Sequence, residues 1–171
     1  MYIEGRDSMF KVNDVVVHYR DGVSTIVGTT VLDGTEFFVL KAKRVDGVSI
    51  YIPIANATQV IRPVMDEANA DAIILYMKGI EANFNPNTKQ RRDDYKRRLA
   101  SGNILDIAYL VRHLYLYKTA ESLPEKVRFG QVDFDILQSA RNMLYDEFCI
   151  TYNCPEEEID EFVVKRMEQL K

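Results

Sequence analysis

The sequence predicts an α+β fold, with a small antiparallel β module at the N-terminus and an all-α helical region after it. Asp-Gly dipeptides at 21–22, 33–34 and 46–47 lie between short runs rich in β-branched and aromatic residues. Asp-Gly favours two-residue hairpin turns, because Gly adopts positive φ at little cost. After Pro63 the apolar residues follow helical spacing, and no further hairpin signal appears.

The β module is expected to contain five short strands within about 50 residues, which is typical of an SH3-like or Tudor-like β-barrel. Gly28 within the second strand predicts a bulge or a tight bend. The expected strands are Val15–Arg20, Gly22–Leu32, Glu36–Arg44, Val48–Ile54 and Ala57–Ile61.

The helical region is divided by capping signals. Asp66 is expected to cap a first helix that ends at Gly79, and Thr88 a second that stops at Gly102. Residues 122–125, with the sequence Ser-Leu-Pro-Glu, form a capping-box motif. The other expected helices are Asn103–Ala120, Val132–Tyr152 and a last one that opens at Cys154–Pro155.

These boundaries predict two domains, a β domain over residues 9–64 and a helical domain over residues 65–171. Residues 3–6, with the sequence Ile-Glu-Gly-Arg, match a protease site used in expression tags. We therefore interpret residues 1–8 as a tag remnant or a frayed extension, outside the fold.

Charge is distributed unevenly along the chain. The net charge is −4, but residues 88–128 carry 10 basic and 5 acidic side chains. Such a concentrated basic segment can bind nucleic acid even in an acidic protein, because the local field steers association. No apolar run reaches the roughly 18 residues of a membrane span, and no signal-peptide pattern is evident, so we expect a cytoplasmic protein without a membrane partner.

The most basic stretch is 89–98, in which six of ten residues are Lys or Arg. One interpretation is a solvated helix face, because Asp93 and Asp94 can pair with Arg97 and Arg98 at i,i+4 spacing. The other is contact with DNA phosphates, which Arg112, Lys118, Lys126 and Arg128 would extend.

No residue pattern indicates catalysis. The chain has two histidines and two cysteines without zinc-ligand spacing, and it has no phosphate-binding loop or nucleophile motif. We therefore expect neither an enzyme, nor a bound metal, nor a cofactor.

Several segments, taken in order, resemble the CarD/CdnL family of bacterial transcription regulators. The resemblance covers about residues 9–152, and no single motif carries it. The similar segments are Phe10–Val17, Phe38–Lys41, Ile52–Ala57, Leu99–Asn103, Ala108–Leu114 and Ser139–Leu144.

The resemblance implies a Tudor-like domain that binds the RNA polymerase β subunit. It also implies a helical domain that contacts promoter DNA at the upstream edge of the melted region. Family members usually carry a Trp wedge near the start of the basic helix, where this chain has Thr88. Relatives often place arginines at the strand positions that correspond to Thr30 and Tyr51.

We therefore expect a monomeric regulator that binds the polymerase β subunit and promoter DNA, weakly and largely without sequence specificity, and modulates open-complex stability. The alternative is an adaptor of the same fold that binds polymerase but has lost productive DNA contact. The expected polymerase-binding residues are Thr30, Val48, Ser49, Ile50 and Tyr51. The expected DNA-binding residues are Thr88, Lys89, Arg91, Arg92, Lys96, Arg97, Arg112, Lys126 and Arg128.

Overall fold

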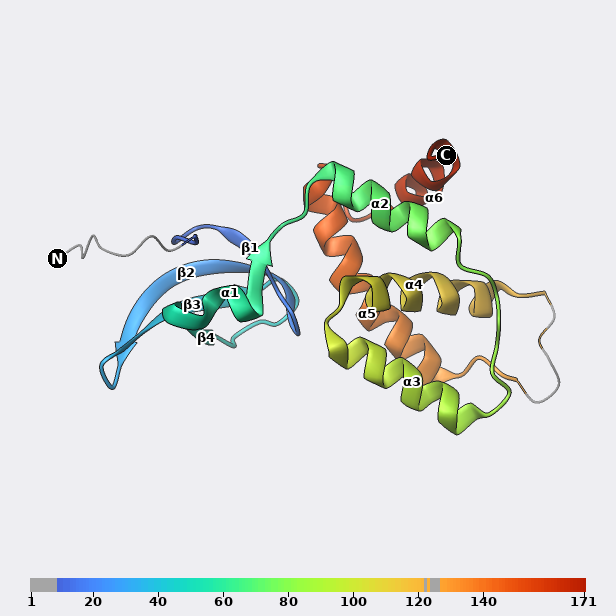
Figure 1. Cartoon of the computed structure of the whole chain (residues 1–171), viewed down its shortest axis with the longest axis horizontal. Helices are drawn as coiled ribbons and strands as arrows, with labels where there is room; N and C mark the ends of the chain where they lie inside the picture. The colour runs from blue at the N-terminus through green and yellow to red at the C-terminus, as the bar shows by residue number, and fades with distance from the viewer. Residues whose placement is uncertain (1–8, 122, 124–126) are drawn as a thin grey trace. The chain divides into compact units, whose positions relative to one another are not determined.

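The computed structural model describes residues 9–121, 123 and 127–171. The chain divides into two compact units between Val64 and Met65. The first unit is built on a β-sheet and the second on α-helices, which confirms the predicted α+β class (Figure 1). The expected tag remnant, the Ser-Leu-Pro-Glu capping box and Lys126 fall wholly or largely outside the described residues.

The β unit contains one five-stranded antiparallel sheet in the order β4-β3-β2-β1-β5. Leu32 pairs with Thr35, so Asp33 and Gly34 form the whole β2–β3 turn, and both have the positive φ that the Asp-Gly signal predicts. The register shifts between Ile26 and Gly28, as expected for a bulge. The strands are β1 (Val15–His18), β2 (Gly22–Leu32), β3 (Thr35–Ala42), β4 (Ile50–Pro53) and β5 (Ile61–Pro63).

The expected strand over Ala57–Ile61 is wrong. Residues Ile54–Asn56 form a 3₁₀ turn (η1) and Ala57–Val60 a single helical turn (α1). The strand that follows, β5, pairs with β1 at the far side of the sheet from β4. The two turns are needed because the chain must cross from one edge of the sheet to the other. Ala57, the first residue of α1, is buried against the core of the β unit.

The helical unit packs around α4, which buries residues on several sides. In Figure 1, α4 lies between α2 and α3, and α5 runs close to it. Its buried side chains include Ile107, Leu110, Leu114 and Tyr117. The helices are α2 (Glu67–Lys78), α3 (Thr88–Ser101), α4 (Ile104–Thr119), α5 (Gln131–Thr151) and α6 (Ile159–Gln169).

Capping explains most of the helix boundaries. Asp66 accepts the Asn69 backbone N–H at 2.8 Å, as expected for an N-cap, and Gly102 ends α3 with φ of 65°. Asn87 rather than Thr88 caps α3, since its side chain accepts the Gln90 N–H at 3.1 Å. The last helix begins at Ile159 rather than near Pro155, because the Glu158 N–H bonds to the Pro155 carbonyl in a turn before it.

Candidate functional sites

The β4 strand forms one open edge of the sheet. Of the residues expected to bind polymerase, Ile50 and Tyr51 lie in β4, whereas Val48 and Ser49 lie in the loop before it. Thr30 lies in β2, and β3 separates it from β4. The structure therefore brings Ile50 and Tyr51 to the edge but places Thr30 two strands away.

The outer face of the sheet connects these positions. Thr30 pairs with Phe37 and Phe37 with Pro53, while Gly28 pairs with Val39 and Val39 with Tyr51. These residues alternate with the buried Phe38, Leu40 and Ile52, so they face away from the core. We call Thr30, Phe37, Val39, Tyr51 and Pro53 the outer apolar face.

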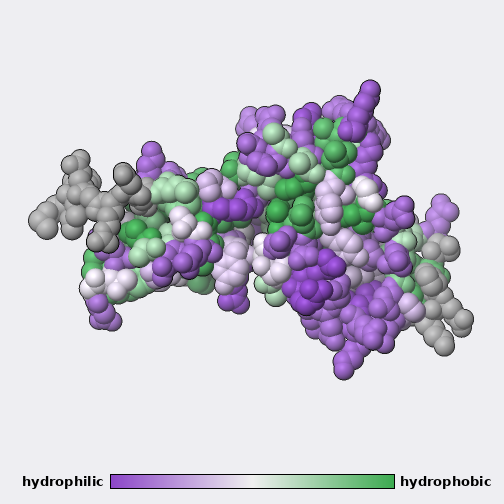
Figure 2. All heavy atoms as spheres, viewed as in Figure 1, coloured by the Kyte–Doolittle hydropathy of each residue, from purple (hydrophilic) through white to green (hydrophobic). Residues whose placement is uncertain are grey.

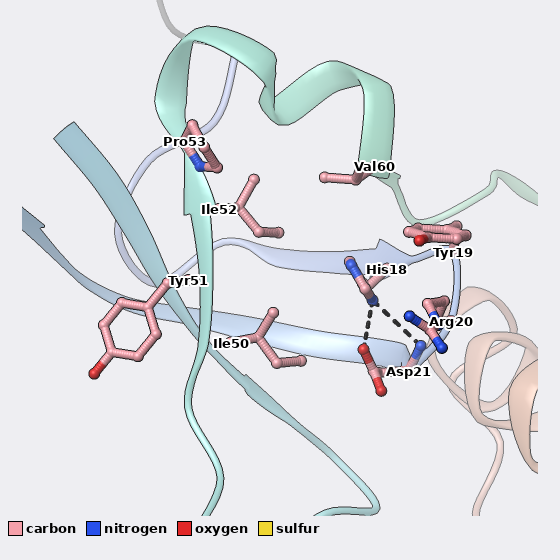
Figure 3. Close-up of a pocket in the computed structure, with 9 residues that line it drawn as sticks. All are labelled: His18, Tyr19, Arg20, Asp21, Ile50, Tyr51, Ile52, Pro53 and Val60. Atoms are coloured by element: carbon pink, nitrogen blue, oxygen red, sulfur yellow. Dashed lines mark hydrogen bonds and ion pairs between the residues drawn. The ribbon is translucent and has the colours of Figure 1, made fainter. Parts of the chain in front are cut away.

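The sequence contains a signal for this face. The run Phe37–Leu40 is apolar at every position, which we interpret from sequence as a strand buried on both faces. In the structure Phe37 and Val39 are only half-buried, and Tyr51 is 52% exposed. Figure 3 shows the Tyr51 ring directed away from Ile50 and Ile52. Apolar side chains are therefore grouped on a face of the sheet that solvent reaches.

The basic helix α3 presents only part of its charge to solvent. Thr88, Lys89, Lys96 and Arg97 are exposed. Lys89 and Lys96 lie seven positions apart, so both fall on the outward stripe of the helix, and neither forms an ion pair with a described residue. Figure 2 shows hydrophilic side chains over this helix.

Arg91 is an interior residue. It is 3% exposed, donates to the Asn85 carbonyl at 2.6 Å and lies over the Tyr117 ring at 5.2 Å. It is not available to a DNA phosphate in this structure. Helical periodicity could not reveal this, because cations occur on every side of α3 in the sequence.

Arg92 is directed toward a buried carboxylate. Its Nη2 lies 3.4 Å from Asp133, which is fully buried and also accepts the Gly130 N–H at 2.9 Å. One Asp133 oxygen, the Tyr117 hydroxyl and two Arg91 nitrogens have no hydrogen-bond partner among the described residues. We call Arg91, Arg92, Tyr117 and Asp133 the buried polar cluster.

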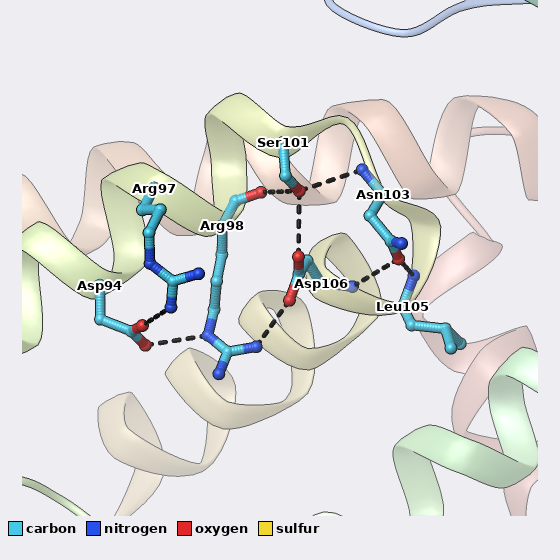
Figure 4. A network of polar contacts seen from close by, with 7 residues as sticks. All are labelled: Asp94, Arg97, Arg98, Ser101, Asn103, Leu105 and Asp106. Atoms are coloured by element: carbon cyan, nitrogen blue, oxygen red, sulfur yellow. Dashed lines mark hydrogen bonds and ion pairs between the residues drawn. The ribbon is translucent and has the colours of Figure 1, made fainter.

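A second network joins the end of α3 to the start of α4 (Figure 4). Arg98 bonds to Asp94 at 2.9 Å and to Asp106 at 2.6 Å, and Asp94 also pairs with Arg97. Partial burial favours the neutral form of Asp94, but the two arginines outweigh it and hold the pKa of this carboxyl below its usual value. The pairs therefore reduce the positive field that α3 projects.

The secondary basic residues are not equivalent. Arg128 is exposed and donates to the Val127 carbonyl, and Lys118 lies 5.5 Å from the Phe134 ring centroid. Arg112 is half-buried, and its Nε has no partner in the described part of the chain. Among the described secondary residues, Lys118 and Arg128 are exposed and Arg112 is not.

Phe84, the aromatic residue nearest to Thr88, packs inward. Its ring centroid lies 5.3 Å from that of His113 and 4.8 Å from that of Tyr117. His113 shares a 2.9 Å hydrogen bond with the Tyr95 hydroxyl, and burial lowers the pKa of its imidazole to about 4. The imidazole is therefore neutral at pH 7 and belongs to an aromatic core beneath the loop that precedes α3.

Among the described side chains, no group of three or more His, Cys, Asp and Glu residues is placed to hold a metal ion. Across the residues that the structure covers, no helix combines the length and apolar character needed to cross a bilayer.

The chain thus combines an open-edged β unit with a helical unit whose helix α3 carries exposed basic side chains. Comparison with protein families identifies the kind of protein. Residues 10–65 match the CarD-like/TRCF RID domain, and residues 72–164 match the CarD C-terminal domain. The chain belongs to the CarD family.

Membership of this family indicates the general class of function. CarD proteins are non-enzymatic, RNA polymerase-interacting transcription factors, and the RID domain is the part that interacts with the polymerase β subunit. No curated protein matches the chain.

Proposed function

We propose that this chain binds the polymerase β subunit through the edge of β4 and the outer apolar face, and that it holds promoter DNA through α3. The two contacts together would modulate the stability of the open complex. The observation that carries the proposal is the apolar, solvent-facing surface beside an open strand edge in a β-subunit-interacting domain. The chain would act as a monomer, because one copy contains both surfaces.

Strand addition fits the β4 edge. A partner strand that pairs with β4 gains backbone hydrogen bonds with little demand on its sequence. The outer apolar face then supplies the side-chain contacts. This assigns Tyr51, Val39 and Pro53 a larger role than Val48 and Ser49, which lie before the strand.

Tyr51→Asp is expected to weaken binding to core RNA polymerase about 30-fold, the size of a typical hot-spot loss. The new carboxylate would have to be desolvated against the apolar face. Binding is measured by biolayer interferometry with immobilised core enzyme. Val31→Asp is the control, because Val31 is also exposed but lies on the opposite side of the sheet. Equal affinities for both variants would contradict the assignment of this face.

The DNA contact is proposed for the exposed residues Thr88, Lys89, Lys96, Arg97 and Arg128, together with the half-buried Arg92. Arg91 is left out because it is buried. The pairs of Arg97 and Arg92 with Asp94 and Asp133 reduce the field further. Binding would be weak, non-specific and salt-dependent, and would matter only while the β unit keeps the chain at the promoter, where effective concentration is high.

Reversing Lys89 and Lys96 to Glu is expected to lower the slope of log K against log salt by about 2, one for each phosphate contact. Fluorescence anisotropy with a promoter duplex measures the slope. Lys165→Glu on α6 is the matched control, since Lys165 is exposed and lies outside the basic helix.

This experiment also separates the proposal from the adaptor alternative. The burial of Arg91 and the neutralisation of Arg97 and Arg98 favour an adaptor that binds polymerase without productive DNA contact. An unchanged salt slope in the double variant, together with a polymerase affinity that depends on Tyr51, would establish the adaptor.

A further inference from the structure

A hollow of about 430 Å³ lies where the sheet fails to close, between the β4 edge and the β1–β2 turn. Figure 3 shows Ile50 and Ile52 directed toward His18, with Val60 of α1 beside them. Tyr19, Arg20 and Asp21 lie along the turn. The hollow therefore has apolar walls on the β4 side and polar groups on the side of the turn.

His18 is the buried polar group of this hollow. The residue is 7% exposed, and its Nδ1 lies 2.7 Å from a carboxylate oxygen of Asp21. Two acceptors would repel at that distance, so the Nδ1 carries the proton and donates it to Asp21. The Asp21 backbone N–H lies 3.3 Å from the same nitrogen. A protonated Nδ1 has no free lone pair, so it cannot also accept a hydrogen bond from that N–H.

This tautomer leaves Nε2 as an acceptor. Nε2 has no hydrogen-bond partner among the described residues, and Figure 3 shows it on the side of the ring that faces Ile52 and Val60. Burial lowers the pKa of His18 and Arg20 adds to this, although Asp21 opposes both. The ring is neutral at pH 7, so the lone pair of Nε2 is available to a donor.

We propose that the hollow receives a tyrosine or tryptophan side chain from the polymerase β-subunit strand that pairs with β4. Alternate side chains of such a strand point to the Ile50 and Ile52 side of the edge. An aromatic body fits the apolar walls, and its hydroxyl or indole N–H donates to His18 Nε2. A purely aliphatic side chain would cover this acceptor without satisfying it, at a cost in affinity.

The inference rests on the proposed function, but its first test does not. The full chain, labelled at Ile, Val and His, is titrated with p-cresol and with toluene in heteronuclear NMR. The two probes share an aromatic body, and only p-cresol has a donor. We expect p-cresol to shift the Ile50, Ile52 and Val60 methyl signals and the His18 ring signals with the tighter affinity. Equal binding of the two probes, or no shift with either, would overturn the proposal.

The second test uses core RNA polymerase. In His18→Asn the amide nitrogen replaces Nδ1 and keeps Asp21 paired, but the acceptor in the hollow is lost. In His18→Gln the amide oxygen takes the place of Nε2. We expect His18→Asn to bind about 5-fold more weakly than the parent and His18→Gln to recover most of the loss, as suits one hydrogen bond.

Val60→Phe adds a steric test, because the larger side chain occupies the hollow. It is expected to weaken polymerase binding about 10-fold or more if an aromatic residue must enter. Thermal unfolding confirms that each variant is folded. If the parent binds polymerase and all three variants bind equally well, the hollow is not used, although the polymerase contact stands. If the parent does not bind polymerase, the proposed function itself fails.

Discussion

Asp133→Ala is expected to lower the free energy of unfolding of the helical unit by about 2–3 kcal/mol, because it removes a helix-start hydrogen bond and the partner of a partly exposed arginine. The substitution removes the fully buried carboxylate that faces Arg92. It also removes the acceptor of the Gly130 N–H at the start of α5. Urea unfolding followed by circular dichroism at 222 nm reports the loss, because the helices of residues 65–171 dominate that signal.

Asp135→Ala is the matched control for this experiment. Asp135 lies two positions further along α5 and is exposed, and its carboxylate accepts a hydrogen bond from the exposed Gln131 side chain at 2.7 Å. Its removal is expected to change the unfolding free energy by no more than about 0.5 kcal/mol. Equal stability of the Asp133 and Asp135 variants would mean that the buried polar cluster does not hold α3 and α5 together.

Phe84→Ala is expected to lower the unfolding free energy by about 2–3 kcal/mol, which is less than for a fully buried phenylalanine because the ring is only half-buried. The ring closes the aromatic core over His113 and Tyr117. Phe134→Ala on α5 is the control, since Phe134 is exposed and contacts Lys118 through its ring face.

The same variant tests whether Phe84 acts on DNA. A side chain that serves as a wedge must leave the core and hold two base pairs apart. Because Phe84 packs inward, its replacement should shorten the open-complex lifetime only as far as the fold is weakened. A shortened lifetime with an unchanged unfolding curve would show that Phe84 enters the groove and that the inward position is not the active one.

Asp133 and Phe84 also help to set the position of the basic helix α3. Asp133 and Phe84 both contact residues that fix the start of α3: Asp133 faces Arg92, and Phe84 packs against Tyr117 beneath Arg91. Loss of either side chain should change the orientation of Lys89 and Lys96 without touching them. If α3 holds DNA as proposed, DNA affinity should fall in the Asp133 and Phe84 variants, although neither residue is proposed to contact DNA.

The sequence by itself determined the features that depend on neighbouring residues. The Asp33–Gly34 turn, the Asp66 cap and the left-handed Gly102 are set by local backbone preferences, and each lies where its signal predicts. The change from period 2 to helical spacing likewise defined the α+β class.

Only the tertiary structure decided which residues of each element face a partner. Cations surround α3 in the sequence, so Arg91 and Lys96 look alike until packing against α4 and α5 buries one of them. The strand order places Thr30 away from the β4 edge, and the chain crossing at Ala57–Val60 moves β5 to the other edge. The His18 hollow lies between strands that are not neighbours in the sheet. Each of these features brings together residues that are distant in the sequence. Its free energy depends on how all the elements pack, and a local sequence pattern contains no information on that packing.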